Sequence, residues 1–237
     1  MSTRATLADV PFGAPRRRPE RVRVVWLVTA LAALVVLGVM SVTIGARLVS
    51  WHDIWAGVLG STDTIGQAAV VKRIPRTFMA LLGGAALGVA GTVMQGVTRN
   101  PLADPGILGV NAGAAFAVVL SMAWFESSLS YVYVLTAVAG AAVAAVFVYV
   151  IGSVGPGGAS PLKLALAGTA TAVALGSLIN AVVLGRNDIG EWVRTWLVGG
   201  VGGVTFDRIL LVLPFLAIGL AISLVSARSL NSLALGE

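Results

Sequence analysis

The stretch RIPRTFMALLGGAALGVAGTVMQGVTRNPLADPGILGVNAG, residues 73–113, decides the fold. It contains a basic segment stiffened by proline, a glycine-rich apolar run, a polar turn with two prolines and the start of a second apolar run. Residues 77–98 are uncharged and long enough to cross a bilayer, where a helix satisfies its backbone groups internally. Gly84, Gly88 and Gly91 lie near one side of that helix, which lets another helix approach closely. We therefore expect this span to be packed inside a helix bundle.

The polar turn after this span carries signals that end one helix and begin another. Asn100 precedes Pro101, and a residue before proline is disfavoured in the helical conformation. Asp104 is placed to cap a new helix, and Pro105 suits its first position. The sequence therefore predicts a short, stiff hairpin between two packed helices.

Three polar amides lie within or near the apolar runs of the chain: Gln95, Asn111 and Asn180. An amide is unfavourable against lipid, so each is better placed against another helix or a water-filled cavity. The alternatives are that Gln95 emerges at the membrane interface and that Asn180 makes structural hydrogen bonds between helices.

Composition defines the class of protein. The 237 residues are 57% hydrophobic and 11% charged, whereas a soluble domain has about 25% charged residues. The absence of cysteine excludes disulfides and thiolate sites. We expect an all-α, polytopic transmembrane helix bundle with about six spans, at residues 24–46, 77–98, 107–125, 130–151, 162–184 and 208–226.

The arginine-rich tail at residues 1–23 favours a cytoplasmic N-terminus and precedes a transmembrane domain at residues 24–237. A cleaved signal peptide is the less favoured alternative, because the first apolar run is longer than a usual signal core. Alternation then puts residues 47–76 outside and the 99–106 turn inside. The basic residues are spread over short loops, so nucleic-acid binding is not expected.

Two outer segments are rich in aromatic residues. Residues 187–197 have apolar and charged residues at helical spacing, which predicts a short amphipathic helix at the outer interface. His52, the only histidine, lies between Trp51 and Trp55. A lone imidazole in a chain without cysteine is a poor metal site, and an interfacial aromatic belt explains its neighbours better. We expect no metal site and no cofactor.

A set of motifs in this order resembles the permeases of iron-siderophore and cobalamin ABC importers, the FecCD family. The motifs are Arg73-Ile74-Pro75-Arg76, Gly84-Ala85-Ala86-Leu87, Gly91, Gln95, Asn100-Pro101-Leu102-Ala103-Asp104-Pro105, Leu108-Gly109 and Gly113-Ala114. Trp196 to Gly199 and Leu230 to Glu237 match further family elements.

This resemblance implies a permease in the plasma membrane of a prokaryote that takes up a ferric siderophore, haem or a corrinoid. Two permease subunits would enclose the path within the lipid, an external substrate-binding protein would deliver the ligand, and separate cytoplasmic ABC ATPase subunits would hydrolyse ATP. The glycine-rich loop at residues 152–158 lacks the G-K-[ST] ending of a phosphate-binding loop, so we expect a flexible turn and no catalytic residues in this chain.

The resemblance also implies roles for individual residues. Arg73 and Arg76 would dock the binding protein, with interfacial snorkelling as the alternative. The three amides would line or support the translocation path. A cytoplasmic hairpin near the ATPase would be formed by Asn100, Pro101, Asp104 and Pro105. The region that couples the permease to the ATPase would begin at Leu235, Gly236 and Glu237.

Family members continue for about four more spans, to about ten, so we expect this chain to be C-terminally incomplete. Two other functions remain open. An ion-coupled secondary transporter would normally need a carboxylate or histidine within a span, and the proposed topology puts all ten acidic residues outside the spans, although sodium could use carbonyl groups. A truncated, non-transporting membrane fragment is the other alternative.

Overall fold

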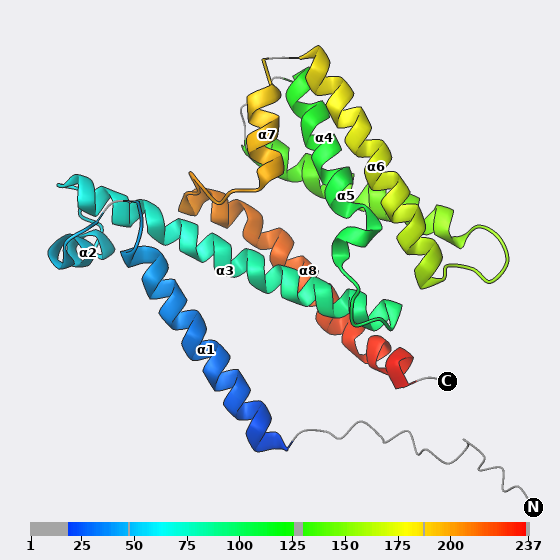
Figure 1. The fold of residues 1–237 in the computed structure, drawn as a ribbon, viewed down its shortest axis with the longest axis horizontal. Coiled ribbons are helices and arrows are strands. Elements are labelled where there is room, and N and C mark those ends of the chain that lie inside the picture. Colours follow the sequence, from blue (N-terminus) through cyan, green and yellow to red (C-terminus); the bar gives the residue numbers. More distant parts are fainter. Residues whose placement is uncertain (1–18, 47, 126–129, 187, 236–237) are drawn as a thin grey trace, which may run out of the picture. The chain divides into compact units, whose positions relative to one another are not determined.

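The computed structural model describes residues 19–46, 48–125, 130–186 and 188–235 (Figure 1). Every regular element in these ranges is a helix, which confirms the all-α expectation. The chain divides into two compact units, residues 1–70 and 71–237. The expected basic tail lies mostly outside the described residues.

The first unit contains α1 (Glu20–Thr43), α2 (Trp51–Val58) and the first residues of α3 (Ile65–Thr98). α1 buries none of its side chains, as suits a helix that faces lipid. α2 packs on the start of α3 through Gly57, where an added Cβ would lie 2.8 Å from Cβ of Val70. The carboxylate of Asp53 strengthens this contact, because it accepts hydrogen bonds from Thr64 Oγ1 at 2.8 Å and Gln67 Nε2 at 3.3 Å.

The second unit holds the rest of α3 and six further elements. They are the 3₁₀ turn η1 (Pro105–Leu108), α4 (Val110–Phe125), α5 (Ser130–Ser153), α6 (Pro161–Gly185), α7 (Gly190–Val198) and α8 (Phe206–Leu235). In the part of the chain that is described, α1, α3, α5, α6 and α8 are long and apolar enough to cross a membrane, and α4 is a shorter apolar helix.

Small residues hold α4 and α5 together. An added Cβ on Gly113 would lie 2.6 Å from the carbonyl oxygen of Gly140 and would also clash with Ala144. An added Cβ on Gly140 would in turn meet Ala117. This close backbone contact is typical of helices that pack through small residues in a membrane.

The contacts also fix the helix directions. α4 runs parallel to α6, because Gly109 lies against Gly168 at one end and Arg186 binds the carbonyl of Ala123 at the other. α3 and α8 run parallel too. The ring of Phe78, within α3, lies 6.2 Å from the ring of Phe206 at the start of α8, and Leu230 approaches Gly96 near the ends of both helices. The 99–109 turn and the α5–α6 loop therefore lie at the same end of this unit, as an alternating topology requires.

Several boundaries and contacts differ from the sequence expectation. α3 begins at Ile65, so the Arg73 to Arg76 element lies inside a helix and not in a loop before it. The expected 107–125 span is divided, because Gly109 adopts φ +67° between η1 and α4. Gly84, Gly88 and Gly91 have no neighbour that an added Cβ would meet, so the expected packing on this face of α3 is absent among the described residues.

Candidate functional site

A pocket of about 530 Å³ brings two of the predicted amides together. Asn111 at the start of α4 and Asn180 on α6 both line it, with Trp196 and Leu197 of α7 on another side. The remaining lining residues are small or apolar: Ala112, Ala114, Ala115, Gly176 and Ile179. Both amides are exposed within the chain. The pocket therefore offers neutral hydrogen-bonding groups beside an aromatic ring.

The hairpin beside this pocket is built by local capping, as the sequence predicts. The two helices that it joins, α3 and α4, do not form the expected packed pair in the described part of the chain. The side-chain oxygen of Asn100 accepts from Leu102 N at 2.9 Å, and that of Asp104 accepts from Gly106 N at 2.7 Å. Pro105 occupies the first position of η1. Arg99, directly after the end of α3, has a φ of +51°, and this left-handed backbone conformation changes the direction of the chain.

The hairpin packs tightly against α6. An added Cβ on Gly168 would collide with the carbonyl of Ile107 and lie 3.0 Å from Cα of Leu108. An added Cβ on Gly106 would lie 3.5 Å from Nδ2 of Asn111, so this amide borders both the hairpin and the pocket. The hairpin and the pocket wall are thus contiguous.

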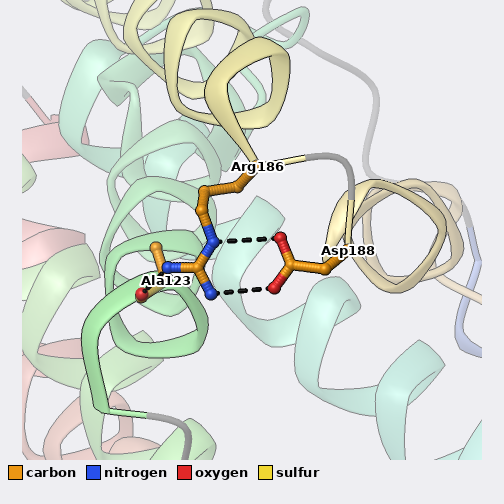
Figure 2. A network of polar contacts seen from close by, with 3 residues as sticks. All are labelled: Ala123, Arg186 and Asp188. Carbon is orange, nitrogen blue, oxygen red and sulfur yellow. Dashed lines mark hydrogen bonds and ion pairs between the residues drawn. The ribbon is translucent and has the colours of Figure 1, made fainter.

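α7 contributes Trp196 and Leu197 to the pocket lining, and a polar network holds the loop before this helix (Figure 2). Arg186 donates from Nε and Nη2 to the two carboxylate oxygens of Asp188, at 2.9 and 2.8 Å, and from Nη1 to the carbonyl of Ala123 at the end of α4. Ile189 and Val193 are buried in a cluster with residues of α4 and α6. The predicted amphipathic helix is confirmed as α7, and its apolar side packs on the bundle.

Hydrogen bonds lower the pKa of two carboxyl groups outside the long helices. The pKa of Asp188 is below its ordinary value mainly because Arg186 donates to the charged form. The pKa of Asp53 is lowered first by the hydroxyl of Ser50 and then by that of Thr64.

The other predicted residues lie apart from the pocket lining. Arg73 and Arg76 are one helical turn apart on α3, with Arg73 half-buried and Arg76 exposed. Gln95 is exposed near the end of α3. Leu235 is the last residue of α8, which extends beyond the expected span, while Gly236 and Glu237 lie outside the described residues.

Sequence reasoning missed two basic residues that organise loops. Arg186 was not singled out, because its carbonyl partner is 63 positions away in the chain. Lys163 donates from Nζ to the carbonyls of Val154, Pro156 and Gly158, at 3.3, 2.8 and 3.1 Å, and so closes the glycine-rich loop. Only its position after this loop could have suggested such a role.

The profile of the FecCD transport family matches residues 33–237. The chain belongs to this family. Among its relatives, it is 38% identical over 216 residues to the iron(3+)-hydroxamate import system permease protein FhuB of Bacillus subtilis, covering 90% of this chain and 56% of FhuB. It is 40% identical over 208 residues to the ferric enterobactin transport system permease protein FepD of Escherichia coli, covering 87% of this chain and 62% of FepD.

A solved structure supports the same fold. It is described as a metal-chelate type ABC transporter in an inward-facing conformation, and it matches with a TM-score of 0.69 and 25% identity over 90% of this chain and 65% of that one. This FecCD chain spans between about half and two thirds of the length of FhuB, FepD and the solved structure. With its apolar helices, it is a multi-pass membrane protein.

Proposed function

We propose that this chain belongs to the permease of a binding-protein-dependent ABC importer for a ferric chelate. The observation that carries the proposal is the pocket that joins Asn111 and Asn180, in a FecCD chain related to iron-chelate permeases. Haem or a corrinoid would be alternative cargoes. The protein would lie in a prokaryotic inner membrane with its N-terminus in the cytoplasm.

The pocket suits a path that releases its cargo. Neutral amides and an aromatic ring provide weak, non-ionic contacts, and they leave no fixed charge to hold a chelate tightly. In this proposal, Asn111 and Asn180 line the path, while Gln95 has a supporting role elsewhere on α3. A second permease subunit would complete the wall.

The hairpin would carry motion from a separate ATPase to this pocket. Asn100, Pro101, Asp104 and Pro105 form a turn stiffened by side-chain caps and proline rings. The turn lies against Gly168 of α6 and is contiguous with Asn111, so a displacement of the hairpin would move one side of the pocket. ATP hydrolysis would belong to the partner and not to this chain.

Arg73 and Arg76 would form the docking site for an acidic substrate-binding protein. Their i, i+3 spacing on a continuous helix gives a fixed separation, and Pro75 between them restricts the local backbone. Charged pairs at such a surface mainly raise the association rate and weaken with salt.

The experiment uses the chain in nanodiscs and a substrate-binding protein from an iron-chelate importer that the wild-type chain captures. The double variant Arg73→Glu and Arg76→Glu is expected to slow capture about tenfold or more at low salt, with a smaller effect at high salt. Arg194→Glu is the matched control, because it reverses an exposed charge on α7. Equal capture by the wild type and the double variant would refute the docking assignment.

A further inference from the structure

α2 presents an aromatic side that no other described residue covers. Trp51, Trp55 and Val58 have exposed fractions of 81%, 70% and 50%. Their spacing of four and three residues puts them on one side of the helix. Such a surface would be unfavourable in water, because it leaves two large aromatic side chains solvated.

The opposite side of α2 is fixed to α3, so the aromatic side cannot turn inward. Gly57 is buried against Val70, and the Asp53 carboxylate is held by Thr64 and Gln67 at the start of α3. Ser50 caps the first turn of α2 by accepting from Asp53 N at 3.2 Å. These contacts hold α2 in an orientation that keeps Trp51 and Trp55 on the outside of this unit.

The neighbouring helices indicate what covers the aromatic side. α1 ends at Thr43, α3 begins at Ile65, and both are long and apolar enough to cross a membrane. The seven residues 44–50 reach at most about 25 Å, so α2 remains close to the membrane surface. Tryptophan is enriched at that depth, because its ring is apolar and its N–H can still contact water or headgroups.

We propose that α2 is a membrane-surface anchor whose Trp51, Trp55 and Val58 insert into the boundary between lipid headgroups and acyl chains. Anchoring α2 would also fix the start of α3, because Asp53 and Gly57 connect the two helices. The proposal does not depend on the transported substrate.

Tryptophan fluorescence tests this anchor in the full chain. One variant retains only Trp51 and Trp55, through Trp26→Phe, Trp124→Phe, Trp192→Phe and Trp196→Phe. A matched control retains only Trp26, which lies on α1. Both are reconstituted in phosphatidylcholine vesicles that contain lipids brominated either near the headgroup or near the chain end, and acrylamide is added from the water phase.

We expect shallow bromines to reduce the emission of Trp51 and Trp55 by about twofold, with little effect of deep bromines or acrylamide. Full quenching by acrylamide without quenching by bromolipid would overturn the proposal and leave this side for water or a protein partner. An unquenched Trp26 control would also overturn it, since α1 would then not lie in the bilayer.

Discussion

Gly113 and Gly140 bring the backbones of α4 and α5 into direct contact, with no room for a side chain on either residue. Gly113→Ala would put a methyl group 2.6 Å from the Gly140 carbonyl oxygen, so the helices must separate. We expect a loss of about 1–3 kcal/mol in the free energy of unfolding, measured by denaturant titration in detergent.

Gly84→Ala is the matched control for that substitution. Gly84 also lies within a long helix, but an added Cβ would meet nothing within 4 Å. The control should leave stability unchanged or raise it by up to about 1 kcal/mol, because alanine favours the helix. Equal destabilisation by both substitutions would contradict the assigned helix contact.

Gly168→Ala should detach the hairpin from α6, because the new methyl group would collide with the carbonyl of Ile107. We expect faster amide hydrogen exchange at residues 102–109 than in the wild type. Gly176→Ala lies on the same helix with open space around it and should leave this exchange unchanged. Unaltered exchange in Gly168→Ala would show that the hairpin does not depend on this contact.

The Arg186 to Asp188 pair predicts a dependence of stability on acid. Since hydrogen bonding lowers the folded-state pKa of Asp188, its contribution is present above the ordinary value of 3.8 and is lost as the pH falls through the lower folded-state value. Thermal unfolding measured from pH 6 to about 2 should show a smaller acid-induced fall in Tm for Asp188→Asn than for the wild type. An equal acid-induced fall in Tm for both proteins would show that the Asp188 carboxylate does not contribute to the acid dependence of stability.

Ser121 is a buried residue of α4 whose hydroxyl has no hydrogen-bond partner among the described residues. Ser121→Ala should therefore be neutral or stabilising by up to about 1 kcal/mol, because an unsatisfied polar atom is removed. Thr171→Val is a useful comparison, since the Thr171 hydroxyl donates to the carbonyl of Ala167 at 2.7 Å. The Ser121 variant should rank as the more stable of the two in the same denaturant titration, and the reverse order would contradict this view of Ser121.

Local chemistry made the hairpin predictable. Asn100 and Asp104 cap the backbone within two residues of themselves, so the sequence contains the whole interaction. The start of α3 was not predictable in this way, because the uncharged run begins only at Thr77, after Lys72, Arg73 and Arg76. The beginning of the helix is supported instead from α2, where Asp53 accepts a hydrogen bond from Thr64.

Glycine spacing could not identify the contacting faces. Gly84 and Gly88 have the same four-residue separation as Gly109 and Gly113, yet only the second pair meets other helices in the described chain. The spacing shows that a helix can be approached, whereas the partner is decided by the tertiary arrangement. The pocket could not be predicted from the sequence either, because Asn111 and Asn180 come to line the same pocket only through the parallel packing of α4 and α6.

The membrane orientation of the two ends of α3 is the central claim of the proposed function, and the absence of cysteine makes it directly measurable. Lys72→Cys and Leu102→Cys put single thiols at exposed positions near the opposite ends of the helix. In intact spheroplasts, a membrane-impermeant maleimide should label Lys72→Cys, and it should label Leu102→Cys only after permeabilisation. Labelling of Leu102→Cys from outside, with Lys72→Cys protected, would contradict the account.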